Sequence, residues 1–208
     1  MSTKKQIFIF KTGVYDPLIA GLDKYDSYEL VTTQQYSPPI TRSQTLEKIK
    51  LHIEPKIKQT KTQLFCSYEN RTFETARLFS ESYFKKKLEI VSLYEINEIK
   101  FSLKSLLTKT EYDICGSNLV RERFIEHFIK DQLLESRRQI EKRMKSFLKR
   151  VQLLPEGQHI FFSHSFYMKL LQIYLDNRSL FSKSTISKEA FDPTRRTFDC
   201  CEGFEIRM

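Results

Sequence analysis

Three side chains that can hold a negatively charged group follow short apolar segments of the sequence: Lys11, Arg71 and His164. Ligands of open α/β sheets bind beyond the carboxyl ends of strands, so these side chains are expected to meet at one edge of a sheet. An ammonium, a guanidinium and an imidazole there would bind a phosphate, a sulfate or a carboxylate. A single histidine in a turn is more often structural than catalytic. The coincidence of all three residues favours an anion-binding pocket.

Lys11 is followed by Thr12 and Gly13, and the three come directly after the apolar residues 7–10. Four apolar residues bounded by polar ones are typical of a strand that is covered on both faces. Lys11, Thr12 and Gly13 are therefore predicted at the end of an interior strand. The alternative is that they form only a tight turn, in which Gly13 supplies a positive φ.

Strand and helix patterns alternate along the rest of the chain. Further strands are predicted at residues 62–66, 88–91 and 159–162, with a short strand at 28–31 and an edge strand at 203–206. Helices are predicted within 43–57, where Pro55 shortens the helix, and at 67–84 after a turn, 134–154 and 166–175. Residues 102–132 have a weaker pattern and are expected to form a helical insertion. This order indicates an α/β fold with a central, mostly parallel sheet.

The composition is that of one domain spanning residues 1–208. With 40% hydrophobic residues, the chain can bury a full core. It has no run of about 18 apolar residues, and its start leads directly into the first predicted strand without the apolar region of a signal peptide. We therefore expect an intracellular protein, cytoplasmic or nuclear, without membrane contact.

Neither metal nor cofactor chemistry is indicated by the sequence. The four histidines lack ligand spacing such as i, i+4, and the four cysteines lack zinc spacing. We interpret Cys66, Cys115, Cys200 and Cys201 as reduced thiols, mostly in the core, with the adjacent pair in a strand-like segment. Gly-rich phosphate loops and dinucleotide fingerprints are also missing from the sequence.

The formal net charge is +9, and this is the compositional feature that indicates a partner. A basic surface attracts nucleic acid, acidic proteins and phosphorylated ligands. Lysines and arginines are spread along the chain, but they are densest at 85–87 and 137–150. The alternative is a basic face that is merely solvated.

The motifs of the chain resemble, in their order, those of the histidine phosphatase (phosphoglycerate mutase-like) superfamily. The family's Arg-His-Gly after the first strand corresponds to Lys11, Thr12 and Gly13, and its Pro-Pro-Leu-Thr resembles residues 38–41. Its Ser-Pro-x-x-Arg-x-x-x-Thr-Ala resembles residues 67–76 in spacing, with Arg71 as the phosphate-binding arginine. Its Leu-x-Glu, Glu-Ser and Ser/Thr-His motifs resemble residues 93–95, 135–136 and 163–164.

The resemblance covers nearly the whole chain and implies a three-layer sandwich, in which helices flank the sheet. It implies that Lys11, Arg71 and His164 bind phosphate. It further implies that an acidic residue faces the phosphate, which is Glu95 or Glu98. Residues 102–132 lie where family members vary an insertion that covers the substrate.

Thr12 is the important departure from the family pattern. The residue at this position in the family is a histidine that attacks phosphorus, and a neutral imidazole is available for this near pH 7. A threonine hydroxyl is hardly ionised at that pH and needs an adjacent base. Loss of such a nucleophile lowers the rate by about 10⁶ in a well-studied hydrolase. Lys11 replaces an arginine, which keeps the charge but loses the bidentate grip on phosphate.

The leading hypothesis is therefore a pseudoenzyme with a residual anion pocket, retained as a binding or scaffold subunit of a transcription or signalling complex. The alternative is a weak or altered phosphatase. In that enzyme His164, Glu95 or Glu98 would activate water against a phosphoryl group held by Lys11 and Arg71. A third variant has Thr12 as the nucleophile and His164 as its base.

Overall fold

A five-stranded sheet forms the centre of the protein, in a computed structural model that describes residues 5–14, 39–115, 117–176 and 198–207. The strands are β1 (Gln6–Lys11), β2 (Thr62–Cys66), β3 (Ile90–Ser92), β4 (Gln158–Ser163) and β5 (Gly203–Glu205). Their order is β3-β2-β4-β1-β5, with β5 antiparallel to β1 and the other pairs parallel. The register pairs Lys11 of β1 with Ser163 of β4, so the carboxyl ends of these strands lie at the same edge.

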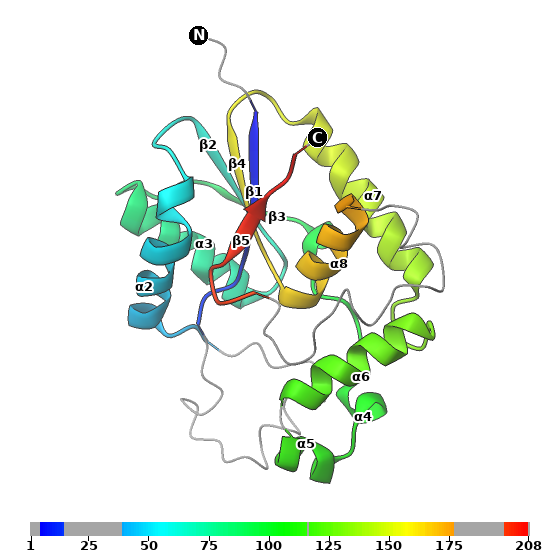
Figure 1. The fold of residues 1–208 in the computed structure, drawn as a ribbon. Helices are drawn as coiled ribbons and strands as arrows, with labels where there is room; N and C mark the ends of the chain where they lie inside the picture. The colour runs from blue at the N-terminus through cyan, green and yellow to red at the C-terminus, as the bar shows by residue number, and fades with distance from the viewer. Residues whose placement is uncertain (1–4, 15–38, 116, 177–197, 208) are drawn as a thin grey trace.

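Helices cover both faces of the sheet (Figure 1). On one face lie α2 (Arg42–His52) and α3 (Asn70–Tyr83), and on the other lie α7 (Arg137–Leu153) and α8 (Ser165–Asp176). Beyond the carboxyl ends of the strands lie α4 (Leu103–Leu106), α5 (Lys109–Cys115) and α6 (Ser117–Ile129). Two short 3₁₀ turns, η2 (Glu54–Lys56) and η3 (Tyr94–Ile96), complete the described elements. The predicted three-layer α/β sandwich is confirmed.

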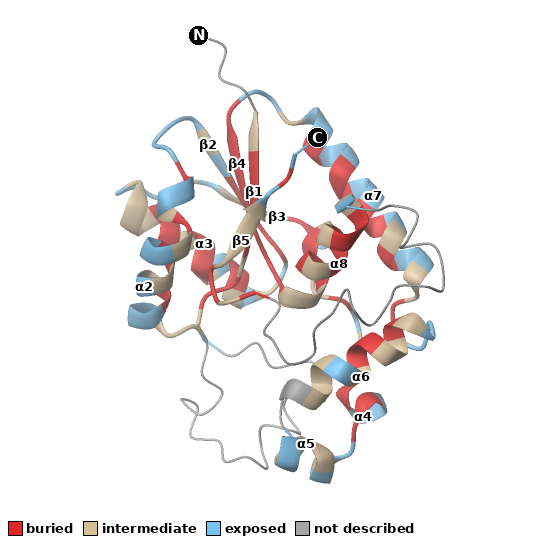
Figure 2. Cartoon of the chain, viewed as in Figure 1, coloured by how far each residue is buried: buried red, intermediate tan, exposed pale blue. Residues whose placement is uncertain are grey.

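The alternation of side chains along β1 explains why both faces are covered. Phe8 and Phe10 belong to the core shared with α2 and α3, whereas Ile7 and Ile9 belong to the core shared with α7 and α8. Successive strand residues point to opposite faces, so an apolar run must be covered on both. Figure 2 shows the buried strands at the centre of the molecule.

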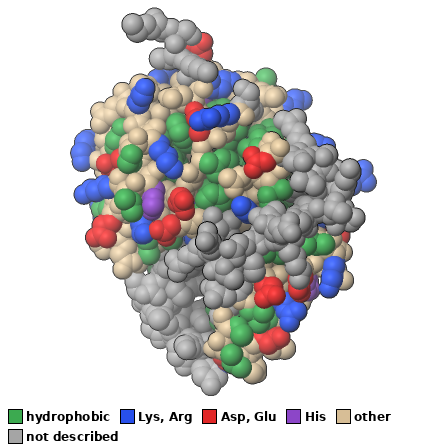
Figure 3. Space-filling model, in the orientation of Figure 1, with side chains coloured by type: hydrophobic (Ala, Val, Ile, Leu, Met, Phe, Trp, Pro, Cys, Tyr) green, Lys and Arg blue, Asp and Glu red, His purple; other side chains and the backbone are tan. Residues whose placement is uncertain are grey.

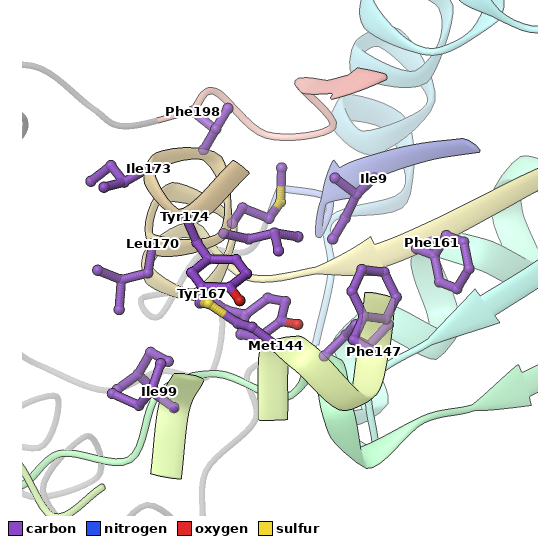
Figure 4. Packing of buried hydrophobic residues seen from close by; sticks show 14 of the residues in the cluster. Ile9, Ile99, Met144, Phe147, Phe161, Tyr167, Leu170, Ile173, Tyr174 and Phe198 are labelled. Carbon is purple, nitrogen blue, oxygen red and sulfur yellow. The ribbon is translucent and has the colours of Figure 1, made fainter. Parts of the chain in front are cut away.

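The core between the sheet and α7 is built around aromatic side chains (Figure 4). The rings of Phe147 on α7 and Phe161 on β4 meet edge to face, with 5.1 Å between their centroids. Tyr167 of α8 is fully buried in the same cluster. This packing fixes β4 against α7 and α8, and β4 leads directly to His164.

Several predicted boundaries shift for local reasons. The helix predicted within 43–57 ends at His52, and Pro55 lies in the separate turn η2. The helix predicted from 134 begins at Arg137, because Ser136 and Gln139 form a capping box. The helices predicted in 102–132 are present as α4, α5 and α6, whereas the strand predicted at 28–31 lies outside the described residues.

Cys200 and Cys201 lie in a turn before β5, so the prediction of a strand-like segment was wrong. The backbone of Cys201 has φ 61°, in the left-handed region. All four cysteines are free, and Cys115 is exposed while the other three are buried. Among the described helices, none has both the length and the apolar character required to cross a membrane.

Candidate functional site

Thr12 lies at the end of β1 with only 2% of its surface exposed. Its hydroxyl donates a hydrogen bond to the carbonyl oxygen of Arg71, at 3.1 Å, and lies 3.3 Å from the hydroxyl of Thr75. Its backbone N–H donates to the carbonyl of Ser163 on β4, at 3.0 Å. The Thr12 hydroxyl proton is thus directed at a backbone carbonyl, which is not a base that could activate the oxygen.

Gly13 is explained by close packing. A Cβ at this position would lie 2.4 Å from Cγ2 of Thr45, a side chain on the buried side of α2. The backbone N–H of Gly13 donates to the Thr75 hydroxyl, at 2.9 Å. Its φ lies outside the left-handed region, where Gly157 is found among the described glycines. The alternative that Gly13 supplies a positive φ is therefore wrong.

Arg71, His164 and Glu69 form one cluster beyond the ends of β2 and β4. The Arg71 Nη2 lies 2.7 Å from Oε2 of Glu69 and 3.2 Å from Nδ1 of His164. The other carboxylate oxygen of Glu69 lies 3.4 Å from Nε2 of His164. The structure thus brings together two of the three predicted phosphate-binding residues, and it places a carboxylate against both of them.

His164 is held in its neutral form. The pKa of His164 lies well below its ordinary value, because the ring is buried and because Arg71, Arg143 and Lys11 place positive charge near it. A guanidinium can only donate, so Nδ1 of His164 accepts from Arg71 and the proton must reside on Nε2. That Nε2 lies 2.7 Å from the hydroxyl oxygen of Ser67, to which it donates.

A chain of hydroxyls extends from Ser67. Its Oγ lies 2.8 Å from Oγ1 of Thr72, which in turn donates to the carbonyl of Glu69, at 2.7 Å. The N–H of Glu69 donates to the Ser67 oxygen, at 3.2 Å. Because these bonds fix the backbone between β2 and α3, they also fix the loop from which the Glu69 carboxylate reaches Arg71.

Lys11, the third predicted phosphate ligand, reaches toward the C-terminal segment. Its Nζ donates to the carbonyl oxygen of Phe198, at 3.0 Å, and its backbone N–H donates to the carbonyl of Glu202. Its charge nevertheless contributes to the lowered pKa of His164. Lys11 therefore adds positive charge to the neighbourhood of His164 while its ammonium group is bound to the turn before β5.

Of the two candidate acidic residues, Glu98 lies beside the cluster and Glu95 does not. The Glu95 carboxylate accepts two hydrogen bonds from Arg150 of α7, at 3.0 and 2.8 Å. The Glu98 carboxylate accepts from the N–H groups of Ile99 and Tyr167, at 3.0 and 2.9 Å, and so binds the first turn of α8, directly after His164. Burial raises the pKa of Glu98, and the nearby charge of Arg71 opposes this shift.

A model of the histidine phosphatase superfamily (branch 1) matches residues 52–186, which is more than half of the chain. The chain belongs to the histidine phosphatase superfamily. Solved structures of this kind share its fold, while no curated protein matches the sequence significantly.

Three solved structures illustrate this likeness. An α-ribazole phosphatase from Shigella flexneri is 16% identical, and the match covers 85% of this chain and 83% of that chain with a TM-score of 0.52. A phosphoglycerate mutase from Bacillus anthracis is 13% identical, covering 87% and 83%, with a TM-score of 0.51. A mycobacterial glucosyl-3-phosphoglycerate phosphatase is 14% identical, covering 82% and 81%, with a TM-score of 0.53. At these low sequence identities, the comparisons show that the fold is shared.

In this histidine phosphatase superfamily member, Arg143 of α7 secures the segment that carries Glu98. Its Nη1 donates to the carbonyls of Glu95 and Asn97, at 3.2 and 2.6 Å. Its Nε and Nη2 each lie 2.8 Å from an oxygen of the buried Glu135 carboxylate. The side-chain oxygen of Asn97 accepts from the N–H of Tyr68, at 2.9 Å. The acidic segment is thus bound both to α7 and to the loop that holds Glu69.

Glu69 is the residue of the cluster that sequence reasoning missed. It lies two positions before Arg71, inside the motif that identified the arginine. Its charge and its place in that loop were the available signal. Within the described residues, no group of three or more His, Cys, Asp or Glu side chains is arranged to hold a metal ion.

Proposed function

We propose that this protein is a catalytically impaired member of the histidine phosphatase superfamily, which keeps an anion-binding pocket and acts as a binding or scaffold subunit. The observation that carries this proposal is the hydrogen bond from the Thr12 hydroxyl to the Arg71 carbonyl, at 3.1 Å. Thr12 stands at the position where the family motif has its nucleophilic histidine. A buried hydroxyl directed at a carbonyl lacks the base that nucleophilic attack requires.

The groups that would bind an anion remain. The Arg71 guanidinium and the Nε2–H of His164 both face the same carboxylate, that of Glu69. A phosphate or another small anion can replace this carboxylate, accept from Arg71, and accept from Nε2–H of His164 when that group turns from the Ser67 hydroxyl to the anion. Lys11 supplies further positive charge nearby. We propose Arg71 and His164 as the direct ligands of the anion and Lys11 as a supporting charge.

The scaffold role is proposed within a larger intracellular complex, such as a transcription or signalling assembly. The net charge of +9 supports attraction to acidic partners in such a complex.

One observation favours the alternative of a weak phosphatase. Burial raises the pKa of Glu98, which lies close to Arg71, and a carboxyl group whose protonated form is favoured in this way is a candidate proton donor to a leaving group. His164 is a poor base for water in this site, since its Nδ1 accepts from Arg71 and its Nε2 already carries a proton. An active enzyme would therefore rely on Glu98.

Phosphate binding and phosphomonoester turnover test the proposal together. We expect inorganic phosphate to raise the melting temperature of the wild type, since a ligand that binds the folded state stabilises it. Arg71→Gln should abolish this shift, whereas Arg77→Gln should retain it, because Arg77 pairs with Glu74 and Glu81 on α3. Turnover by the wild type should not exceed that of Arg71→Gln. Robust turnover that disappears in Arg71→Gln would refute the loss of catalysis.

A further inference from the structure

Helix α7 carries most of the net charge of the chain. Among its 17 residues are seven Lys or Arg and one Glu, which gives the helix a charge of +6, against +9 for the whole protein. Two of these seven side chains form close ion pairs with residues outside the helix. Arg143 pairs with the buried Glu135, and Arg150 pairs with Glu95. Of the remaining five, Arg137 lies 4.0 Å from Asp131 and the other four are exposed.

Four of these residues form a row, which we call the basic stripe: Arg138, Lys142, Lys145 and Lys149. Their spacing of four, three and four residues places them within an arc of roughly 60° at about 100° per residue. All four are exposed. The buried residues of the helix lie on the opposite side (Ile140, Met144, Phe147 and Val151). The basic stripe therefore points directly away from the core.

The protein itself neutralises little of the basic stripe. Lys145 pairs with Glu141 on the same helix, at 2.8 Å. Among the described residues, no carboxylate forms an ion pair with Arg138, Lys142 or Lys149. On the face that Figure 3 shows, basic and acidic side chains are interspersed. Like charges at i, i+3 and i, i+4 along a helix repel, so the row costs stability in the free protein where it is not neutralised, as at Arg138, Lys142 and Lys149.

We propose that the basic stripe binds the phosphate backbone of a nucleic-acid duplex. At 1.5 Å per residue the stripe is about 16 Å long, and a duplex carries one phosphate charge per about 1.7 Å of its axis, so about nine phosphate charges lie within that length. The helix holds its four cations in fixed positions on one side, where they can face this array of phosphates. Lysine and arginine contacts to phosphates carry no sequence information, so this binding is independent of base sequence.

The chemistry of the face distinguishes a duplex from the other polyanions. Binding of single strands uses aromatic side chains on which bases stack, and the residues within and beside the stripe, Glu141 and Ser146, are not aromatic. Protein interfaces have an apolar or aromatic centre, whereas the large exposed apolar residue of α7 is Leu153, at the end of the helix. Four exposed cations with a single carboxylate, Glu141, beside them fit the dense negative charge of a duplex backbone.

Salt-dependent binding of a fluorescent 20-base-pair DNA duplex, followed by anisotropy, tests the proposal on the full chain. Four phosphate contacts predict a slope of about −3.6 for log K against log salt, which is roughly a 150-fold loss of affinity between 50 and 200 mM salt. The single change Lys142→Gln should make this slope less steep by about 0.9. No saturable binding by the wild type at 50 mM salt would overturn the proposal.

A matched pair of variants separates the stripe from net charge. The stripe variant carries glutamine at 138, 142, 145 and 149, and the control carries glutamine at the exposed lysines 50, 58, 86 and 87. Circular dichroism melts should show that both are folded. The stripe variant should lose at least 100-fold in affinity, and the control should lose far less. Equal losses in both, or tighter binding to polyglutamate or to single strands than to the duplex, would contradict the proposal. This proposal does not depend on the anion pocket.

Discussion

The carboxylate of Glu69 lies 2.7 Å from the guanidinium of Arg71, the arginine that the family motif assigns to phosphate. The same carboxylate reaches the imidazole of His164, at 3.4 Å. An incoming anion must displace this internal carboxylate and tolerate its negative charge nearby. In the proposed anion pocket, we therefore expect Glu69 to weaken phosphate binding without blocking it, because its side chain is one-third exposed and can move away.

Replacement of Glu69 should tighten phosphate binding. In Glu69→Gln the side chain keeps its size but loses the charge that competes for Arg71. We expect phosphate affinity to rise roughly fivefold, or about 1 kcal/mol, the usual scale for a partly exposed charge-assisted contact. Isothermal titration with inorganic phosphate measures this change. Glu74→Gln on α3 is the control and should bind as the wild type does; equal or weaker binding by Glu69→Gln would be contrary to this account.

His164 should make stability depend on pH. Its pKa in the folded state lies below the ordinary value of 6.5, so the unfolded chain takes up the proton first as the pH falls. Its contribution to stability is fully present above about pH 6.5 and is lost as the pH falls toward the folded-state pKa, by at most about 1.4 kcal/mol per pH unit. The free energy of unfolding, measured with urea between pH 5 and 7, should therefore rise less steeply with pH in His164→Gln than in the wild type.

Glu98 should act in the opposite sense. Because burial raises its folded-state pKa above the ordinary 4.5, the folded protein binds the proton more tightly than the unfolded chain. The contribution of Glu98 to stability is fully present below about pH 4.5, and it is lost as the pH rises through the raised pKa of the folded state. In Glu98→Gln, the free energy of unfolding should therefore increase more steeply with pH than in the wild type. An unchanged pH dependence in this variant would contradict the burial of the carboxyl group.

The ion pair between Arg143 and Glu135 should be important for stability. Both residues are buried, at 6% and 7% exposure, and they form two hydrogen bonds of 2.8 Å. Arg143→Met leaves the Glu135 carboxylate without its cation, which typically costs about 3 kcal/mol or more. Urea unfolding of Arg143→Met measures this loss, and the exposed Arg138→Met on the same helix should change stability by less than about 0.5 kcal/mol.

The double variant Arg143→Met with Glu135→Leu provides a second check. Removing both charges also removes the uncompensated carboxylate, so part of the lost stability should return. If the double variant is as unstable as the sum of the two single variants, the ion pair is not the origin of the effect.

The layers of the fold followed from the sequence because apolar runs and helical spacing report burial directly. Residues 62–66 were predicted with the bounds that β2 has: the apolar residues 64–66 mark its buried end, and the polar Ser67 follows them. The third strand was predicted at 88–91 but spans Ile90–Ser92, because its pairing with Leu64 through Cys66 of β2 sets its limits. Pairing between strands depends on tertiary register, which a single strand pattern does not contain.

The candidate site was partly predictable for a similar reason. Arg71 and His164 were identified because each follows a strand, and strand ends converge at one edge of the sheet. The choice between Glu95 and Glu98 depends on the backbone. The turn η3 ends at Ile96 and Asn97 is extended, with ψ 158°, so Glu95 and Glu98 point to different partners. Glu69 was missed because its role depends on the fixed conformation of the loop between β2 and α3.

Hydrolysis of a generic phosphomonoester by the wild type and by Thr12→His, assayed side by side, tests the central claim most directly. Both proteins are also titrated with phosphate, which establishes that the pocket is intact in each. The account predicts an inert wild type, phosphate binding by both proteins, and measurable turnover in Thr12→His, since an imidazole at this position can attack phosphorus. Turnover by the wild type at a rate that Thr12→His does not exceed would contradict the account, because Thr12 would then not be the cause of lost catalysis.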